Sequence, residues 1–256
     1  METPNDQDLA LHGMNAKQGG KILLLACGAL AREILDILTI NNWLHIDLQC
    51  LPAIFHNHPE KITPAIEAAI GKYKQGYEKI FVVYADCGTG GALQRLCAAQ
   101  GVEMLEGPHC YSFFEGNRQF AQRDEFTAFY LTDFLVRQFD AFIWKPLGLE
   151  QHPELLTTYF GNYTTLVYQA QTDDAQLTQL AHAHAQRMGL AFERRFTGYG
   201  DLQRVYKLKL DAPARPPNEC GLSLLLPRLS AAKTNAHPSP AAPIDPQRRW
   251  PSPLLN

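Results

Sequence analysis

Three cysteines of this 256-residue chain stand where a thiol could bind a metal ion or react. Cys27 and Cys87 each come directly before a glycine at the expected end of an apolar strand, and Cys110 follows His109 in the segment GPHCY. His56, in the segment FHNHPE, adds an imidazole. Thiolate and imidazole groups suit Zn²⁺, and three protein ligands leave a fourth coordination position for a substrate. The sequence therefore predicts a zinc site on Cys27, Cys87 and Cys110.

Two other interpretations of these cysteines stay open. The chain contains no CxxC pair, so the spacing matches no standard zinc knuckle. Free cysteines are often small buried residues that fill tight turns. Alternatively, Cys87 could be a metal-free nucleophile assisted by Asp86 or His109, because the start of a helix lowers the pKa of a thiol. Whether the chain is an enzyme is left open.

A glycine-rich turn, residues 87–91, follows the same expected strand as Cys87. Successive glycine amides at a helix start can bind an anion. The turn matches neither the GxGxxG nor the Walker pattern, so it does not predict nucleotide binding. We expect a small-molecule substrate to contact residues around the cysteines, namely His56, Asp86, Gly88, Gly90 and His109.

The segments that must position these groups alternate between strand and helix patterns. Apolar or alternating runs predict strands over residues 21–26, 45–51, 79–84 and 102–105, with apolar residues at helical spacing between them. This alternation is typical of βαβ units, so we expect an α/β fold with a Rossmann-like open, mainly parallel sheet. Ligands of such sheets bind at the carboxyl ends of the strands, where the cysteines are expected.

The second part of the chain is expected to add helices and further strands. Residues 125–163 are rich in aromatic side chains and indicate a mostly helical segment that crosses or caps the sheet. Two strands are expected around a helix that ends near Met188, and a last strand is expected at 202–210. Glu33 and His184 are expected on the surfaces of their helices.

Composition divides the chain into three segments. We expect residues 1–20 to be a flexible N-terminus, residues 21–210 to form a single α/β domain, and residues 211–256 to be a disordered, proline-rich tail. The last segment holds ten of the 17 prolines. Proline at this density prevents a helix or a sheet from propagating.

Charge and hydropathy exclude several classes of protein. The 23 basic and 26 acidic residues give a net charge of −3, which argues against nucleic acid as a partner. No apolar run is long enough to span a membrane, and the N-terminus does not have the pattern of a secretory signal. We therefore expect a cytoplasmic protein, whose six cysteines are thiols or metal ligands rather than disulfides. The sequence does not indicate an oligomeric state.

Six motifs across residues 22–206 give the chain a resemblance to a known family. They are LLACGALARE, LPAIFHNHPEKI, YADCGTGG, GPHCYSFF, FYLTDFL and GLEQHPELLTTYFGNY. Together they resemble a family of prokaryotic proteins catalogued as domain of unknown function 1638. The motifs contain all three cysteines, His109, His56 and Glu60. Where relatives often have Arg before the proline of the second motif, this chain has His58.

The resemblance implies a metabolic setting rather than a reaction. Some members of the family are encoded near corrinoid-dependent methyltransferases, which implies a role in one-carbon or thiol methyl metabolism. Zinc-thiolate sites activate thiols for methyl transfer, so the predicted site is compatible with that role. The alternative is a non-catalytic accessory protein that binds a corrinoid or methyltransferase partner.

Overall fold

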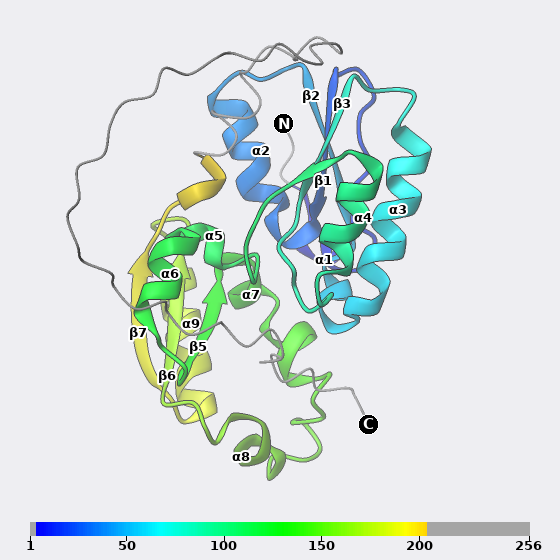
Figure 1. Ribbon diagram of the computed structural model, residues 1–256. Helices are drawn as coiled ribbons and strands as arrows, with labels where there is room; N and C mark the ends of the chain where they lie inside the picture. The colour runs from blue at the N-terminus through cyan, green and yellow to red at the C-terminus, as the bar shows by residue number, and fades with distance from the viewer. Residues whose placement is uncertain (1–3, 204–256) are drawn as a thin grey trace, which may run out of the picture.

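The computed structural model describes residues 4–203, which form an α/β fold with two parallel sheets (Figure 1). The first sheet has the strand order β2-β1-β3-β4. Its strands are β1 (Ile22–Cys27), β2 (Ile46–Leu51), β3 (Lys79–Val83) and β4 (Glu103–Met104). The second sheet has the order β5-β6-β7, with β5 (Ala128–Thr132), β6 (Thr165–Ala170) and β7 (Ala191–Phe196). The predicted fold class is confirmed, although two sheets take the place of the expected one.

Helices cover both faces of the first sheet. Helix α2 (Ala31–Ile40) lies on one side, and α3 (Ile62–Tyr73) and α4 (Ala92–Gln100) lie on the other (Figure 1). The central strand β1 is therefore apolar along its whole length, as expected of a strand buried on both faces. The chain passes from β1 outward to β2 and then returns to place β3 on the other side of β1. The strand order thus reverses between β1 and β3, which is where open α/β sheets bind ligands.

Short helices and turns connect these elements. The short helices along the first sheet are α1 (Asp6–Leu11), η1 (Gly28–Leu30), η2 (Ala53–Asn57) and η3 (Pro59–Lys61). The second part of the chain contains α5 (Ser112–Glu115), α6 (Asn117–Arg123), α7 (Asp133–Arg137), η4 (Asp140–Trp144), α8 (Leu155–Phe160) and α9 (Ala175–Met188). No helix among the described residues is both long and apolar enough to cross a bilayer.

The aromatic segment 125–163 is less helical than expected. It contains β5, an edge strand of the second sheet whose residues from Phe129 onward are buried. Most aromatic side chains of the segment belong to the continuous buried core, whereas Phe126 is exposed. Aromatic content therefore indicated burial and not helix.

Several local expectations differ from the structure. Glu33 and His184 are both buried. Glu33 lies near Asp133 and Arg137 of α7, and His184 lies in α9, which packs against α7. Residues 200–203 are helical, so the strand expected from 202 does not begin there, and the rest of it lies outside the described residues. Helix α1 forms within the segment expected to be flexible and buries Leu9 and Ala10. The expected tail, residues 211–256, also lies outside the described residues.

Candidate metal centre

The candidate site lies where the strand order reverses, at the carboxyl ends of neighbouring strands. Cys27 is the last residue of β1, and Cys87 follows β3, the strand paired with β1. His56 lies in η2, which begins two residues after β2. Cys110 follows β4, the partner of β3. The parallel register brings four segments that are far apart in sequence to one edge of the sheet.

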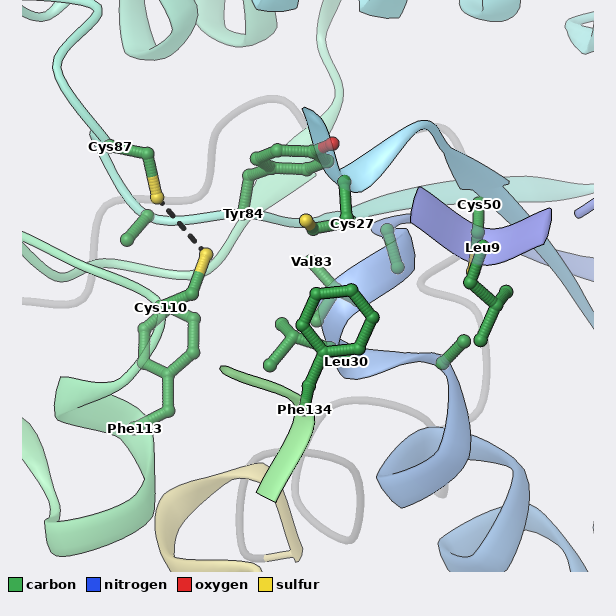
Figure 2. Close-up of a cluster of buried hydrophobic side chains, with 14 of the residues drawn as sticks. Leu9, Cys27, Leu30, Cys50, Val83, Tyr84, Cys87, Cys110, Phe113 and Phe134 are labelled. Atoms are coloured by element: carbon green, nitrogen blue, oxygen red, sulfur yellow. Dashed lines mark hydrogen bonds between the residues drawn. The ribbon is translucent and has the colours of Figure 1, made fainter. Parts of the chain in front are cut away.

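Backbone hydrogen bonds join the two loops that carry Cys87 and Cys110. The Asp86 amide donates to the Gly107 carbonyl at 2.9 Å, and the Cys87 amide donates to the Pro108 carbonyl at 3.1 Å. The two sulfur atoms consequently lie 3.0 Å apart and face each other (Figure 2). Both cysteines are buried.

Cys87 has a backbone conformation that is unusual for a residue with a side chain. Its φ is 45°, in the left-handed region that glycine normally occupies. The loop joined to residues 107–108 imposes this conformation, which aims the side chain at Cys110. Such strain at a non-glycine residue is characteristic of functional sites.

His56, Cys87 and Cys110 form a group that could bind a metal ion. Their ligand atoms all lie within 4.8 Å of one another. The two cysteines are buried and His56 is half-buried, so the group lies just beneath the surface. Sequence analysis expected His56 to contact substrate, whereas the structure places it among the potential metal ligands.

Cys27 lies beside this group rather than within it. Its sulfur is 3.4 Å from Nδ1 of His56 and accepts a hydrogen bond from the Ala29 amide at the start of η1. The predicted trio of Cys27, Cys87 and Cys110 is thus brought to one site, but the compact metal-binding group contains His56 in place of Cys27.

The pKa values of the group move in opposite directions. Burial lowers the pKa of His56, but the Cys27 and Cys87 sulfurs outweigh burial and raise it well above its usual range. A hydrogen bond from Cys110 has the largest effect on the pKa of Cys87 and lowers it. Burial raises this pKa, but His56 lowers it further, so the pKa of Cys87 lies well below its usual value. The same contact with Cys87, together with burial, raises the pKa of Cys110. Without a metal, the arrangement therefore favours a Cys87 thiolate beside a protonated His56.

The remaining predicted substrate residues surround the group in different ways. The His109 ring is half-buried and stacks on Tyr111 at 5.0 Å, and burial lowers its pKa. The Asp86 carboxylate accepts hydrogen bonds from Thr89, Gly90 and Gly91 within its own turn. The Gly90 amide is therefore already paired, and Asp86 closes the turn.

Tyr84 was not identified from the sequence, yet it lies fully buried against the cysteines. It follows β3 directly, and its ring lies between Cys27 and Cys87 in Figure 2. Its position at the end of the apolar run KIFVVY indicated only a core aromatic residue. The sequence feature that could have identified Tyr84 as a site residue is a phenol hydroxyl at the carboxyl end of a central strand.

Comparison with known proteins identifies a family but no characterised relative. The family model described as "Protein of unknown function (DUF1638)" matches residues 50–206. This range contains His56, Cys87 and Cys110, and it confirms the resemblance derived from the motifs. Neither a curated protein nor a solved structure matches the chain.

Proposed function

This chain belongs to the DUF1638 family of proteins of unknown function, and we propose that it is a zinc-thiolate protein that binds a small thiol substrate. In this proposal His56, Cys87 and Cys110 hold the ion. The observation that carries it is the convergence of three donor atoms, from three different strand ends, within 4.8 Å of one another. If these cysteines only filled space in the hydrophobic core, a histidine beside their two facing sulfurs would not be needed.

The donor set fits zinc better than a hard cation. Two sulfurs and one imidazole nitrogen are ligands that Zn²⁺ takes, whereas Ca²⁺ and Mg²⁺ require oxygen ligands. Three protein ligands leave one position for an exogenous group. When bound, the ion would lower the pKa of a coordinated thiol and so make it nucleophilic at neutral pH.

The surrounding residues prepare the ligands. The lowered pKa of Cys87 supplies the thiolate that metal binding requires. The Cys27 sulfur beside Nδ1 would fix the orientation of the His56 ring, as hydrogen-bond partners of metal-binding histidines do. Phe113 and Phe134 lie next to the cysteines and keep water from the buried side of the group (Figure 2).

We further propose that the thiol takes part in corrinoid-linked methyl metabolism, with a methyltransferase as a protein partner in the cytoplasm. The support for this step is the family resemblance and the compatibility of zinc thiolates with thiol alkylation. A small thiol such as 2-mercaptoethanol would serve as the first probe of the open position.

Metal analysis of the untagged protein, expressed with zinc, iron and cobalt available, tests the site. We expect about one zinc ion per chain in the wild type and in Cys97→Ala, a matched control that removes another buried cysteine, in α4. His56→Ala, Cys87→Ala and Cys110→Ala should each lose the ion. Cys27→Ala should still bind zinc, with roughly 10- to 100-fold lower affinity, which is the usual effect of removing a residue that hydrogen-bonds to a metal ligand. Full metal content in all three ligand variants would disprove the proposal.

A second function is favoured by the low pKa of Cys87, namely a metal-free reactive thiol. In that case the folded wild type would contain no metal, and Cys87 would react with iodoacetamide at pH 6 faster than any other cysteine. The contact with Cys110 and the proximity of His56 supply the reason. Zinc at one ion per chain, with Cys87 protected from labelling, would exclude this alternative.

A further inference from the structure

Tyr84 has a buried hydroxyl group with no hydrogen-bond partner. The residue is 0% exposed, and among the described residues its hydroxyl has no hydrogen-bond partner of good geometry, although the Cys27 sulfur is close enough to interact with it. Leaving a buried hydroxyl unpaired destabilises the folded state, and almost all such groups in proteins are paired. The unpaired hydroxyl therefore points to a partner that is not among the described residues, such as a bound ligand.

The neighbours of the hydroxyl place that partner at the candidate metal centre. Tyr84 directly follows β3 and precedes Cys87 by three residues, so its ring lies at the same strand end as the candidate ligands. Figure 2 shows the ring beside Cys27, with the facing pair Cys87 and Cys110 on its other side. Thiol sulfur is a weak acceptor and does not satisfy a buried phenol.

We infer that the Tyr84 hydroxyl donates a hydrogen bond to an anionic ligand in the open coordination position of the proposed zinc site. This inference rests on the proposed function and specifies the class of ligand. The ligand must coordinate through an atom that keeps a free lone pair, as a thiolate sulfur or a hydroxide oxygen does. A neutral nitrogen ligand such as imidazole uses its lone pair for coordination and offers Tyr84 no acceptor.

Two features of the site agree with a donor role for Tyr84. A phenol has an ordinary pKa of about 10, so its hydroxyl carries a proton that it can donate at neutral pH. Phe134 and Val83, on the same side of the cluster, are apolar and offer the ligand no hydrogen bond (Figure 2). In such surroundings a hydrogen bond to an anion is stronger than one in water.

Tyr84→Phe removes the hydroxyl and keeps the ring, so it isolates this hydrogen bond. Calorimetric titration of the zinc-loaded wild type and variant with 2-mercaptoethanol and with imidazole measures the selectivity. We expect Tyr84→Phe to weaken binding of the thiol at least tenfold, which is the loss of one hydrogen bond to an anion, and to change imidazole binding less than twofold.

Stability of the metal-free protein gives a second measurement, independent of the metal. Tyr84→Phe should unfold at the same temperature as the wild type or at a higher one, because it removes an unpaired hydroxyl. The matched control is Tyr73→Phe, since the buried Tyr73 hydroxyl donates to Gln49 at 2.8 Å and its removal should lower the unfolding temperature.

The outcomes separate this inference from the proposed function. If Tyr84→Phe weakens the binding of 2-mercaptoethanol and of imidazole equally, Tyr84 only shapes the site. If the binding of neither probe changes, Tyr84 makes no hydrogen bond to the ligand. Either result overturns the inference and leaves the proposed zinc site intact. A wild type that binds no metal would overturn the proposed function and this inference together. A lower unfolding temperature for metal-free Tyr84→Phe would show that the hydroxyl has a partner within the chain, and would also overturn it.

Discussion

Cys87 differs from an ordinary buried cysteine in its backbone, its sulfur contact and its acidity. Its φ of 45° carries strain that a glycine would not have, and its sulfur faces Cys110 at 3.0 Å. The neighbouring Cys110 and His56 lower its pKa despite burial. At the scale of single residues, Cys87 is therefore the centre of the candidate chemistry, and Cys27 and Tyr84 act around it.

Glu33 is a second unusual residue, and it lies outside the metal centre. Its side chain is buried in α2, and Oε2 has no partner among the described residues. Burial raises its pKa to about 7, and the nearby Asp133 and Asp36 add to the shift while Arg137 opposes it. The carboxyl group is therefore neutral in mildly acidic solution, and above neutrality it ionises in a buried position where Oε2 has no hydrogen-bond partner among the described residues.

Glu33→Gln should remove a pH-dependent loss of stability. Because the pKa is raised on folding from 4.5 to about 7, the wild type has its full stability below pH 4.5 and loses it as the pH rises through 7. By pH 8 the loss is on the order of 3 kcal/mol. Urea unfolding at pH 4.5 and pH 8 should show the variant about equal to the wild type at the lower pH and more stable at the higher.

A control for this measurement is Glu67→Gln, an exposed position on α3. It should leave the difference between the two pH values unchanged. If Glu33→Gln shows the same pH dependence as the wild type, Glu33 is not the buried acid responsible.

At the scale of elements, close packing of α1 against the end of β1 depends on Gly28. A Cβ at this position would lie 2.4 Å from the Leu9 carbonyl oxygen and 3.0 Å from that of Leu51. Glycine here lets α1 and the end of β2 approach the residue next to Cys27. The element that carries Cys27 is thus held by backbone contacts on both sides.

Gly28→Ala should therefore destabilise the protein, by about 1–3 kcal/mol as for other overpacked sites. Gly71→Ala is the matched control, because Gly71 lies inside α3 and a Cβ there would meet nothing within 4 Å. Alanine is the better helix former, so Gly71→Ala should stabilise by about 0.5–1 kcal/mol. Thermal unfolding of both variants measures the two effects, and a neutral Gly28→Ala would contradict the packing argument.

At the scale of the whole molecule, the two sheets are joined by side chains from distant parts of the chain. The Asp6 carboxylate pairs with both Arg32 and Arg137, and the Tyr199 hydroxyl donates to Asp36 at 2.6 Å. The buried apolar residues of both sheets form one continuous core. These contacts favour a single cooperative unit, and the single domain expected over residues 21–210 stays a prediction that unfolding experiments can test.

Two tryptophans allow a direct test of that cooperativity. Trp43 follows α2 beside the first sheet, and Trp144 ends η4 in the second part of the chain. In a Trp250→Phe background, Trp43→Phe and Trp144→Phe each leave one fluorescent probe. In each variant we expect the urea midpoint from tryptophan fluorescence to equal the urea midpoint from circular dichroism. This comparison within one variant removes the effect of the substitution on stability. Separate midpoints within one variant would show that the two sheets unfold independently.

Sequence patterns determined the α/β class, most elements of the first sheet and the identity of the cysteines at its carboxyl edge. These properties are local, because a buried parallel strand is apolar along its length and an amphipathic helix repeats every 3.6 residues. The motifs also determined the family, which the match over residues 50–206 confirms.

Only the tertiary structure decided which side chains meet. The strand order places β1 beside β3, and two backbone hydrogen bonds join residues 86–87 to 107–108, so Cys87 faces Cys110. His56 enters the group because η2 folds back over the same edge. The Tyr84 hydroxyl and Oε2 of Glu33 prove to be buried with no hydrogen-bond partner among the described residues. Contacts between segments far apart in the chain depend on strand order and loop geometry, which no local pattern of residues encodes.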